Sequence, residues 1–416
     1  MTTLIIGAGV IGTTLAYELA LMGEKVTVVD AAAGPALETS FANGSLITPS
    51  MSDPWASPGV PRMLFKYPGR EDAPFLLRLR ALASMAHWGV AFLRNCSPEK
   101  WRDNTRAVFP LAEYSRDQLD AMTRELGLDY DRLGEGTLRI HEDAASMRAA
   151  DAALAVYRDL GCEIGVLGRE ECLAMEPSLR PVARGIHGGF HFPGDRSGDC
   201  HVFTRQVMAR AAEKGAAFQF NSKVTALKVE SGRLKAVLTS SGPIATDRFV
   251  LAAGSYSLGL GRQAGLRIPV FPVKGYSATF DVSGWNRPPS VPFVDNSRKI
   301  AVVRMGNRLR IAGTAEFAGF DRRDNPVRSG VLLKHFKSLF PESTGVGPPQ
   351  YWHGLRPMSP DGRPFIGRTR LSNLYVNTGH GPLGWTLACG SAKALAQVIR
   401  GVRPDIDLEP FALGRT

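Results

Sequence analysis

The chain opens with the stretch that decides its fold, Thr3-Leu4-Ile5-Ile6-Gly7-Ala8-Gly9-Val10-Ile11-Gly12. The apolar run at 3–6 predicts a buried strand, and a glycine-rich turn follows it at once. Thr13–Met22 predicts a helix because its apolar residues share one face, and Val26–Val29 predicts a second strand that ends at Asp30. A strand, glycine turn, helix, strand and terminal acid within about 30 residues is the pattern of a dinucleotide-binding unit.

Each glycine of this turn has a separate physical role. Gly7 permits the tight turn, Gly9 lets a pyrophosphate approach the backbone, and Gly12 lets the helix pack closely on the strand. Val10 and Ile11 are further cofactor-binding candidates in this turn, and the N-terminus of the helix after it presents unpaired N–H groups and a partial positive charge that favour phosphate. The alternative is a glycine-rich turn without a ligand.

The acid and two later glycine loops indicate which dinucleotide binds. Asp30 is placed to accept hydrogen bonds from a ribose hydroxyl, and its charge would repel the 2′-phosphate of NADP. Arg248–Ala253 and Leu374–Asn377 predict two further strands that run into glycine loops, and Trp385–Arg400 predicts a long helix. Three such elements indicate a cofactor longer than one loop can grip, namely FAD held non-covalently. The later cofactor-binding candidates are Ala253, Gly254, Gly381, Leu383, Gly384 and Trp385.

Composition sets limits on the class of protein. The 416 residues, 44% of them hydrophobic and 21% charged, predict two globular domains. Five scattered cysteines without a CxxC pair favour a reducing compartment, and neither a disulfide framework nor a metal site is expected. No run of about 20 apolar residues predicts a membrane span, and the early first strand leaves no room for a leader, so a cytoplasmic location is expected.

The net charge of +11 is unevenly distributed along the chain. Between Arg62 and Arg106 lie nine Lys/Arg and four Asp/Glu, and Pro74–Leu93 mixes apolar and aromatic residues with Arg78 and Arg80. A basic amphipathic helix here would suit peripheral contact with the anionic inner face of the cytoplasmic membrane. The alternative is a helix with an apolar side in the core and solvated arginines. No nucleic-acid-binding module accompanies the charge, so nucleic acid is not an expected partner.

Longer strings along almost the whole chain resemble one family. The strings are Glu38-Thr39-Ser40-Phe41-Ala42-Asn43, Pro54-Trp55-Ala56, Lys274-Gly275-Tyr276-Ser277, Gly354-Leu355-Arg356-Pro357-Met358-Ser359-Pro360-Asp361-Gly362 and Asn377-Thr378-Gly379-His380-Gly381. The chain resembles the FAD-dependent D-amino acid dehydrogenases of small-subunit type, in the group that includes D-amino acid, glycine and sarcosine oxidases.

The resemblance implies an α/β fold of interleaved domains. A Rossmann-type FAD domain would use residues 1–50, 195–262 and 350–416. An α+β substrate domain, built on a large antiparallel sheet, would use residues 51–194 and 263–349. The implied reaction is oxidative deamination of a D-amino acid to the 2-oxo acid and ammonia, by hydride transfer from Cα to nitrogen N5 of the flavin. The implied electron acceptor is a quinone or another acceptor than oxygen.

Three residues are catalytic candidates. Arg356 is placed by the resemblance where the substrate carboxylate binds, and its planar fork can grip both carboxylate oxygens. Tyr276 either supplies a hydroxyl to the substrate or packs its ring in the core. His380 either takes part in the chemistry or is a loop residue beside the flavin. The remaining cofactor candidates are the loop residues Thr39, Ser40, Asn43, Gly44 and Ser45, and Val224, expected to end a short strand and bind adenine through its backbone.

Two departures from the family pattern bear on the substrate. Gly44-Ser45-Leu46-Ile47 stands where an alanine–glycine–glutamine pattern is expected, and Ser297-Arg298 stands where a tyrosine is expected. If Arg298 reached the pocket, its charge would favour an acidic or polar side chain on the substrate. Two other functions stay open at this point, an FAD enzyme acting on glycine, sarcosine or hydroxyproline-type amino acids and a non-catalytic FAD-binding subunit.

Overall fold

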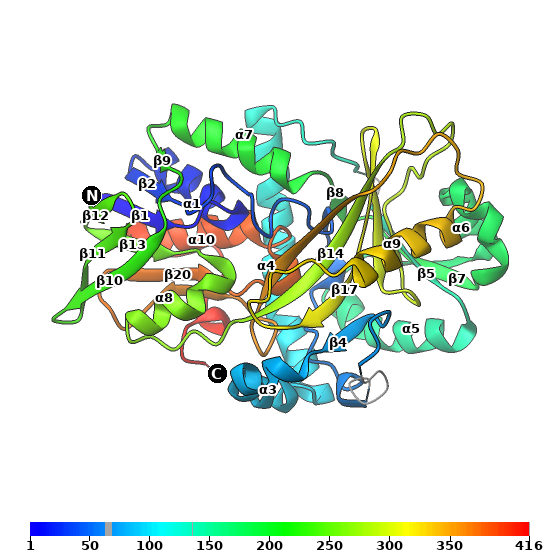
Figure 1. Ribbon diagram of the computed structural model, residues 1–416, viewed down its shortest axis with the longest axis horizontal. Helices are drawn as coiled ribbons and strands as arrows, with labels where there is room; N and C mark the ends of the chain where they lie inside the picture. Colours follow the sequence, from blue (N-terminus) through cyan, green and yellow to red (C-terminus); the bar gives the residue numbers. More distant parts are fainter. Residues whose placement is uncertain (63–68, 135, 416) are drawn as a thin grey trace.

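A computed structural model describes residues 1–62, 69–134 and 136–415, which form two units side by side (Figure 1). Among these residues the first unit contains a sheet of six strands in the order β19-β20-β13-β1-β2-β9. The strands pair in parallel except for β19, which runs antiparallel to β20. Their bounds are Phe365–Arg368, Leu374–Thr378, Arg248–Leu251, Thr2–Ile6, Lys25–Val29 and Ala217–Gln219.

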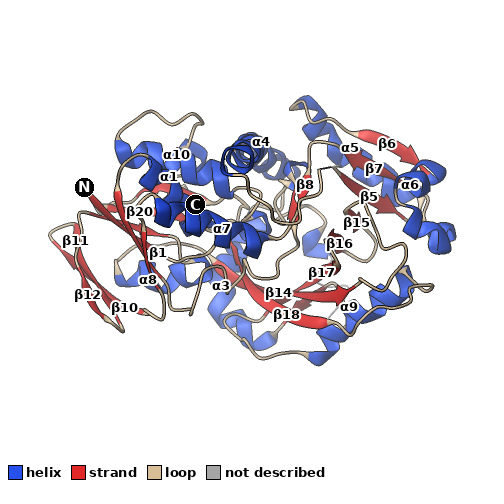
Figure 2. Ribbon diagram, turned by 90° about the horizontal axis from the view of Figure 1, so that it is seen from above, coloured by secondary structure: helices blue, strands red, loops and turns tan. Residues whose placement is uncertain are grey.

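Both faces of this sheet are covered, as its continuous apolar strands require. Helices α1 (Val10–Leu21), α4 (Pro98–Leu126), α7 (Cys200–Glu213) and α10 (Ala388–Arg400) supply the core against one face, which includes Ile5. The small sheet β10 (Val224–Glu230), β11 (Arg233–Thr239) and β12 (Gly242–Ile244) and helix α8 (Ser257–Gln263) cover the other (Figure 2).

The glycine turn after β1 is as tight as its sequence predicts. Gly7 has a φ of +112°, and a Cβ there would lie under 3.0 Å from the carbonyl of Ala252. A Cβ on Gly12 would lie under 3.0 Å from the carbonyl of Gly7, so any side chain would push α1 off the turn. The glycines therefore bring the N-terminus of α1 against the carboxyl edge of the sheet.

The second unit is built on a large, mostly antiparallel sheet. Nine described strands form it, eight of them in the order β18-β14-β17-β16-β15-β5-β7-β6, while β4 pairs in parallel with β17. Helix α9 (Pro326–Leu339) packs on one face. The strand bounds in that order are Gln350–Met358, Phe271–Asp281, Arg308–Phe317, Ile300–Met305, Phe293–Asp295, Thr137–His141, Gly188–Phe192 and Gly165–Gly168, with β4 at Phe75–Leu77.

Two predicted domain boundaries need correction. Strand β18, at residues 350–358, belongs to the large sheet and not to the FAD unit, because it pairs with β14 along its whole length. Helix α4, from the segment 51–194, packs on the FAD unit, where Ser115 Oγ accepts a hydrogen bond of 3.0 Å from the N–H of Gly390. The chain therefore passes between the two units more often than the predicted domain ranges imply.

Three predicted elements also differ. The segment 74–93 is not one helix: it forms β4, a short 3-10 turn at Leu79–Ala81 and helix α3 (Leu82–Arg94), because pairing with β17 holds its first part extended. Val224 begins a strand instead of ending one, and the final helix begins at Ala388. The other α-helices and strands of the described residues are α5 (Ala144–Asp159), α6 (Arg169–Met175), β3 (Leu46–Ile47) and β8 (Arg196–Ser197). None of the helices described is both long and apolar enough to cross a bilayer.

Candidate active site

A cavity of about 620 Å³ lies between the two units. The carboxyl ends of β1, β2, β13 and β20 line one side of it, and β14 and β18 of the large sheet line the other. Most of the predicted site residues meet here: Gly7, Gly9, Val10, Ile11, Asp30, Thr39, Ser40, Asn43, Gly44, Val224, Ala253, Gly254, Tyr276, Arg356, His380, Gly381, Gly384 and Trp385. Gly12, Ser45 and Leu383 do not line it.

The glycine end of the cavity is held by side chains as well as by backbone. Asp30 accepts hydrogen bonds from the N–H of Ala8 at 2.6 Å and of Ala32 at 2.8 Å, so its carboxylate also fixes the turn. Ser40 Oγ accepts from the N–H of Val10 at 3.1 Å, at the start of α1. The loop after β2 is thereby fastened to the helix N-terminus that is expected to meet phosphate.

Arg356, on β18, is a cation on the side of the cavity that the large sheet lines. Its guanidinium lies over Gly275, where a Cβ would come under 3.0 Å from it, and about 5.4 Å from the Trp55 ring. Burial, and then the charge of Arg328, lower its pKa to about 10, so it stays charged at neutral pH. In the described part of the chain no carboxylate pairs with it.

A β-bulge directs the one protein hydrogen bond of this guanidinium among the described residues. The register of β14 and β17 shifts at Thr314, which has a φ of +56°. Such a bulge turns one carbonyl out of the ladder, and the Thr314 carbonyl accepts from Nη1 of Arg356 at 3.2 Å. Thr39 Oγ1 and Ser255 Oγ both donate to the carbonyl of Leu355, which fixes the strand beside Arg356 against the first unit.

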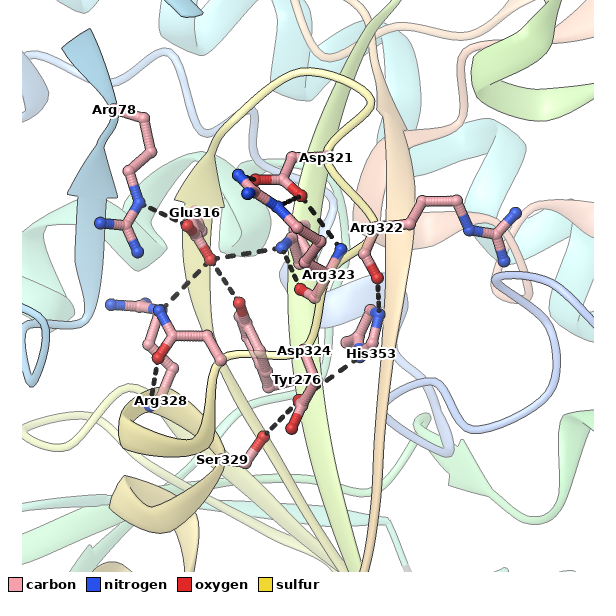
Figure 3. A network of polar contacts seen from close by, with 12 residues as sticks. Arg78, Tyr276, Glu316, Asp321, Arg322, Arg323, Asp324, Arg328, Ser329 and His353 are labelled. Atoms are coloured by element: carbon pink, nitrogen blue, oxygen red, sulfur yellow. Dashed lines mark hydrogen bonds and ion pairs between the residues drawn. The ribbon is translucent and has the colours of Figure 1, made fainter. Parts of the chain in front are cut away.

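Tyr276 does not present its hydroxyl to Arg356. Side chains alternate along a strand, and Arg356 covers Gly275, so the neighbouring Tyr276 points to the opposite face, toward Arg328 of α9. Its hydroxyl donates to Glu316, beneath the sheet (Figure 3). Burial, and then this carboxylate, raise the pKa of the phenol. The geometry therefore supports the packing interpretation and gives no support to a direct contact with substrate.

Glu316 is the centre of a buried polar network (Figure 3). Arg78 Nε donates to it at 2.6 Å, Lys274 Nζ lies at 3.7 Å and Arg328 Nε at 4.0 Å. Arg328 also donates to the carbonyl of Ala315, next to the bulge, at 3.2 Å. Removal of the carboxylate would leave buried cations unpaired, which is strongly destabilising.

Two other predicted residues lie apart from the cavity. Arg298 pairs with Asp295 at 2.5 Å on the far part of the large sheet, so its charge does not reach the substrate pocket. Ser45 is fully buried, and its hydroxyl accepts a hydrogen bond of 2.9 Å from Arg310 of β17. Its role is therefore to join the two units. No group of three metal-binding side chains is placed for a metal ion in the residues that the structure describes.

Comparison with known proteins decides the family. The model of the family described as FAD dependent oxidoreductase (DAO) matches residues 2–398. The chain belongs to this family. It is 41% identical over 415 residues to a D-amino acid dehydrogenase of Bradyrhizobium diazoefficiens, covering 100% of this chain and 99% of that one. It is 43% identical over 416 residues to a D-amino acid dehydrogenase of Dechloromonas aromatica, covering 99% of each.

Solved structures share the fold of this FAD-dependent oxidoreductase. Glycine oxidase from Geobacillus kaustophilus superposes with a TM-score of 0.78 at 23% identity, covering 100% of this chain and 98% of that one. L-proline dehydrogenase from P. horikoshii superposes with a TM-score of 0.79 at 18% identity, covering 100% and 97%. The predicted Rossmann-type unit with a second, sheet-based unit is confirmed.

The residues that line the cavity fit FAD, the cofactor of this family, because several of their buried polar atoms lack a hydrogen-bond partner. Among the described residues, Ser222 Oγ, Asn377 Oδ1, His380 Nε2 and Trp385 Nε1 are buried, line the cavity and have no hydrogen-bond partner. Buried polar atoms are rarely left unpaired in a folded protein. A long cofactor rich in hydrogen-bonding groups satisfies such atoms along its whole length.

His380 is an uncharged polar group of this site. It is 1% exposed, and burial lowers its pKa to about 3, so the imidazole is neutral at neutral pH. A neutral imidazole both donates and accepts a hydrogen bond but carries no charge for a carboxylate. Its Nε2 is buried without a hydrogen-bond partner among the described residues, which is compatible with either interpretation of His380.

Sequence reasoning missed several residues that line the cavity. The missed residues are Glu38, Tyr256, Arg322 and Trp352. Glu38 lies in the segment 38–43 that resembles the family, whereas the other three stand in no recognisable motif. Tyr256 follows the predicted loop at Gly254 by two residues, which was the one signal for it. Arg322 lies in the loop after β17 and reaches the cavity only through the packing of the two units.

Proposed function

We propose that this chain oxidises a D-amino acid to a 2-imino acid, which water converts to the 2-oxo acid and ammonia. The observation that carries the proposal is the Arg356 guanidinium, which lines the FAD cavity without a carboxylate partner in the described chain. A partly buried cation without a counter-ion calls for an anionic ligand. The curated relatives named D-amino acid dehydrogenase, above 40% identity over their full length, support this choice of substrate.

The residues of the chain position the substrate for this reaction. Arg356 holds the carboxylate through two parallel hydrogen bonds, which fixes the orientation of the α-carbon. The rigid strands β14 and β18, with the Thr314 carbonyl, hold the guanidinium itself. Bound FAD supplies the chemistry by accepting the α-hydrogen as hydride, while the amine gives up a proton as the C=N bond forms.

We also propose that His380 accepts a hydrogen bond in this site while uncharged. Its low pKa keeps one ring nitrogen unprotonated near neutral pH, and that nitrogen can accept a hydrogen bond. The partner is the substrate amine or the flavin edge, and both lie within the role predicted for this loop.

We further propose that a membrane quinone accepts the electrons and that helix α3 makes the membrane contact. On α3 and the turn before it, four apolar side chains are exposed, Leu79 at 80%, Val90 at 50%, Leu93 at 48% and Leu82 at 43%. The membrane contact would be apolar, because Arg78 pairs with Glu316 and Glu71 and Arg80 pairs with Asp321. These ion pairs make the two arginines weaker candidates for anionic headgroups than the sequence alone predicts.

Anaerobic reduction of the bound flavin by a panel of amino acids tests the proposed reaction. D-amino acids should bleach the flavin band faster than L-amino acids, glycine, sarcosine or hydroxyproline. Preference for one of the last three would identify the alternative enzyme, and a flavin that stays oxidised with every compound would identify a non-catalytic subunit. Oxygen consumption without another acceptor would contradict a quinone.

Arg356→Lys tests the residue that carries the proposal. A lysine cannot make the paired contact, and one charge-assisted hydrogen bond is worth about 1.5–3 kcal/mol. We expect kcat/KM to fall by roughly 10- to 150-fold while FAD stays bound. Arg368→Lys, on β19 outside the cavity, is the matched control and should stay near wild type. Wild-type kinetics in Arg356→Lys would remove Arg356 from the site.

A further inference from the structure

The loop 318–325, between β17 and α9, brings an unpredicted cation to the cavity. Arg322 in this loop lines the cavity, although the loop belongs to the second unit and the glycine turn to the first. In Figure 3 its side chain points away from the Glu316 network, while its backbone lies within the drawn contacts. The guanidinium therefore reaches out from the large sheet toward the FAD unit.

Arg322 bridges two segments of the FAD unit. Its Nη1 donates to Glu38 Oε1 at 2.8 Å and to the Tyr256 hydroxyl at 2.7 Å. Glu38 belongs to the loop after β2, and Tyr256 follows β13, so the two partners come from opposite sides of β1 in the sheet. Both partners line the cavity as well. The hydrogen bonds of Arg322 to Glu38 and Tyr256 thus connect the two units at the wall of the cavity.

This bridge lies close to the expected position of the phosphates. Glu38 is separated from Ser40 by one residue, and Ser40 Oγ accepts the hydrogen bond from the N–H of Val10 at the start of α1. Helix N-termini of this kind bind the pyrophosphate of a dinucleotide. Arg322 is therefore bonded to the same loop that contacts this helix N-terminus, where a pyrophosphate with two negative charges would bind.

The base of the loop is fixed while the guanidinium stays exposed. Lys274 Nζ donates to the carbonyl of Arg323 at 2.9 Å, and the carbonyl of Arg322 lies 2.8 Å from His353 Nε2. The side chains of Arg322 and Glu38 are 54% and 43% exposed, and exposed ion pairs of this type are weak. The Arg322–Glu38 contact can therefore break while the backbone of the loop stays in place.

We propose that Arg322 is a cofactor-retaining residue, which closes the cavity over bound FAD by bridging Glu38 and Tyr256. Opening of this bridge admits and releases FAD, and closing slows its escape. The inference rests on the FAD site and not on the choice of amino acid. A protein that bound FAD but left D-amino acids untouched would still allow the test.

The test is the rate at which the holoprotein releases FAD after dilution, followed by the fluorescence of the free cofactor. Arg322→Ala should release FAD severalfold faster than wild type, up to about fivefold, which is the upper range for the loss of an exposed ion pair. Glu38→Gln, which removes the charged partner, should also release FAD faster. High salt should accelerate release from wild type more than from Arg322→Ala, because salt screens an exposed ion pair.

Arg323→Ala is the matched control. Arg323 is the next residue, is 74% exposed and pairs with Asp321, and it does not line the cavity. Its FAD release should stay within about twofold of wild type, since its ion pair with Asp321 makes no bridge at the cavity. Release from Arg322→Ala at the wild-type rate would overturn the proposal. Equal acceleration in Arg323→Ala would overturn it too, because the effect would then belong to the loop and not to the bridge.

Discussion

At the scale of single residues, the candidate carboxylate site depends on Gly275 having no side chain. Gly275 leaves the space that the Arg356 guanidinium occupies, and it does so from the neighbouring strand β14. Its φ lies outside the left-handed region, so the backbone itself would accept any residue. The glycine is needed for space and not for conformation.

Gly275→Ala is therefore expected to damage substrate binding while preserving the fold. The new Cβ would lie under 3.0 Å from the guanidinium and displace it. A displacement of about 1 Å at a reacting group costs roughly 100-fold in rate, so we expect a fall of this order in kcat/KM with FAD still bound. Gly330→Ala, in α9 with open space around its Cβ, is the control. Unchanged kinetics in Gly275→Ala would mean that the carboxylate binds elsewhere.

Residue identity alone did not reveal which way some side chains point. The string around Tyr276 was recognisable, but its hydroxyl lies beneath the sheet because β14 pairs with β18 in the register that places Gly275 under Arg356. Register is a property of two distant segments, and a one-residue shift would reverse every side chain. The bulge at Thr314, whose carbonyl holds Arg356, likewise carries no local sequence signal.

At the scale of elements, the glycine turn and its flanking strands and helix follow directly from local pattern. The strands at 248–251 and 374–378 also lie where apolar runs predict them. The segment 74–93 is predicted as one basic helix because it mixes apolar and aromatic residues with arginines. Its first part is a strand because the end of β17, more than 230 residues away in the chain, extends beyond its pairing with β16 and pairs there with residues 75–77. Distant pairing of this kind outweighs local propensity.

Helix α3 is the element on which the membrane proposal can be tested. Leu82→Gln with Leu93→Gln would remove two exposed apolar side chains, each worth about 1.5–3 kcal/mol when fully buried. We expect at least about tenfold weaker binding to vesicles of phosphatidylcholine and phosphatidylglycerol in a sedimentation assay.

The control for α3 uses apolar residues that are equally exposed on other elements. Val166→Gln with Val402→Gln changes two side chains that are each 57% exposed, on β6 and after α10. This variant should bind vesicles as wild type does. Equal loss in both pairs, or in neither, would show that α3 does not form the contact.

At the scale of the whole molecule, buried titratable groups set the pH range in which the protein is stable. His141 is 1% exposed, and burial, with Arg139 and Lys299 nearby, lowers its pKa to about 4 from an ordinary value of 6.5. Between these two pH values the unfolded chain binds a proton that the folded chain does not. Stability from this group is therefore present above pH 6.5 and is lost as the pH falls toward 4.

His141→Asn is expected to reduce this acid sensitivity. Between pH 7 and pH 5 wild type should lose about 2 kcal/mol of unfolding free energy through His141, a loss that the asparagine variant avoids. Urea unfolding at the two pH values measures the difference, and other titrating groups cancel because both proteins share them. Identical losses in the two proteins would assign the acid sensitivity to other groups.

The division of the FAD sheet among distant segments has a consequence for how the enzyme is made. Strand β1 is synthesised first, yet its neighbour β13 and the next strand β20 come from residues 248–251 and 374–378. At ordinary ribosomal speed, roughly 20–75 s separate the first strand from β20. The nascent chain must keep its first apolar strand from aggregating throughout that interval, and the coenzyme can be captured only after β20 has been synthesised.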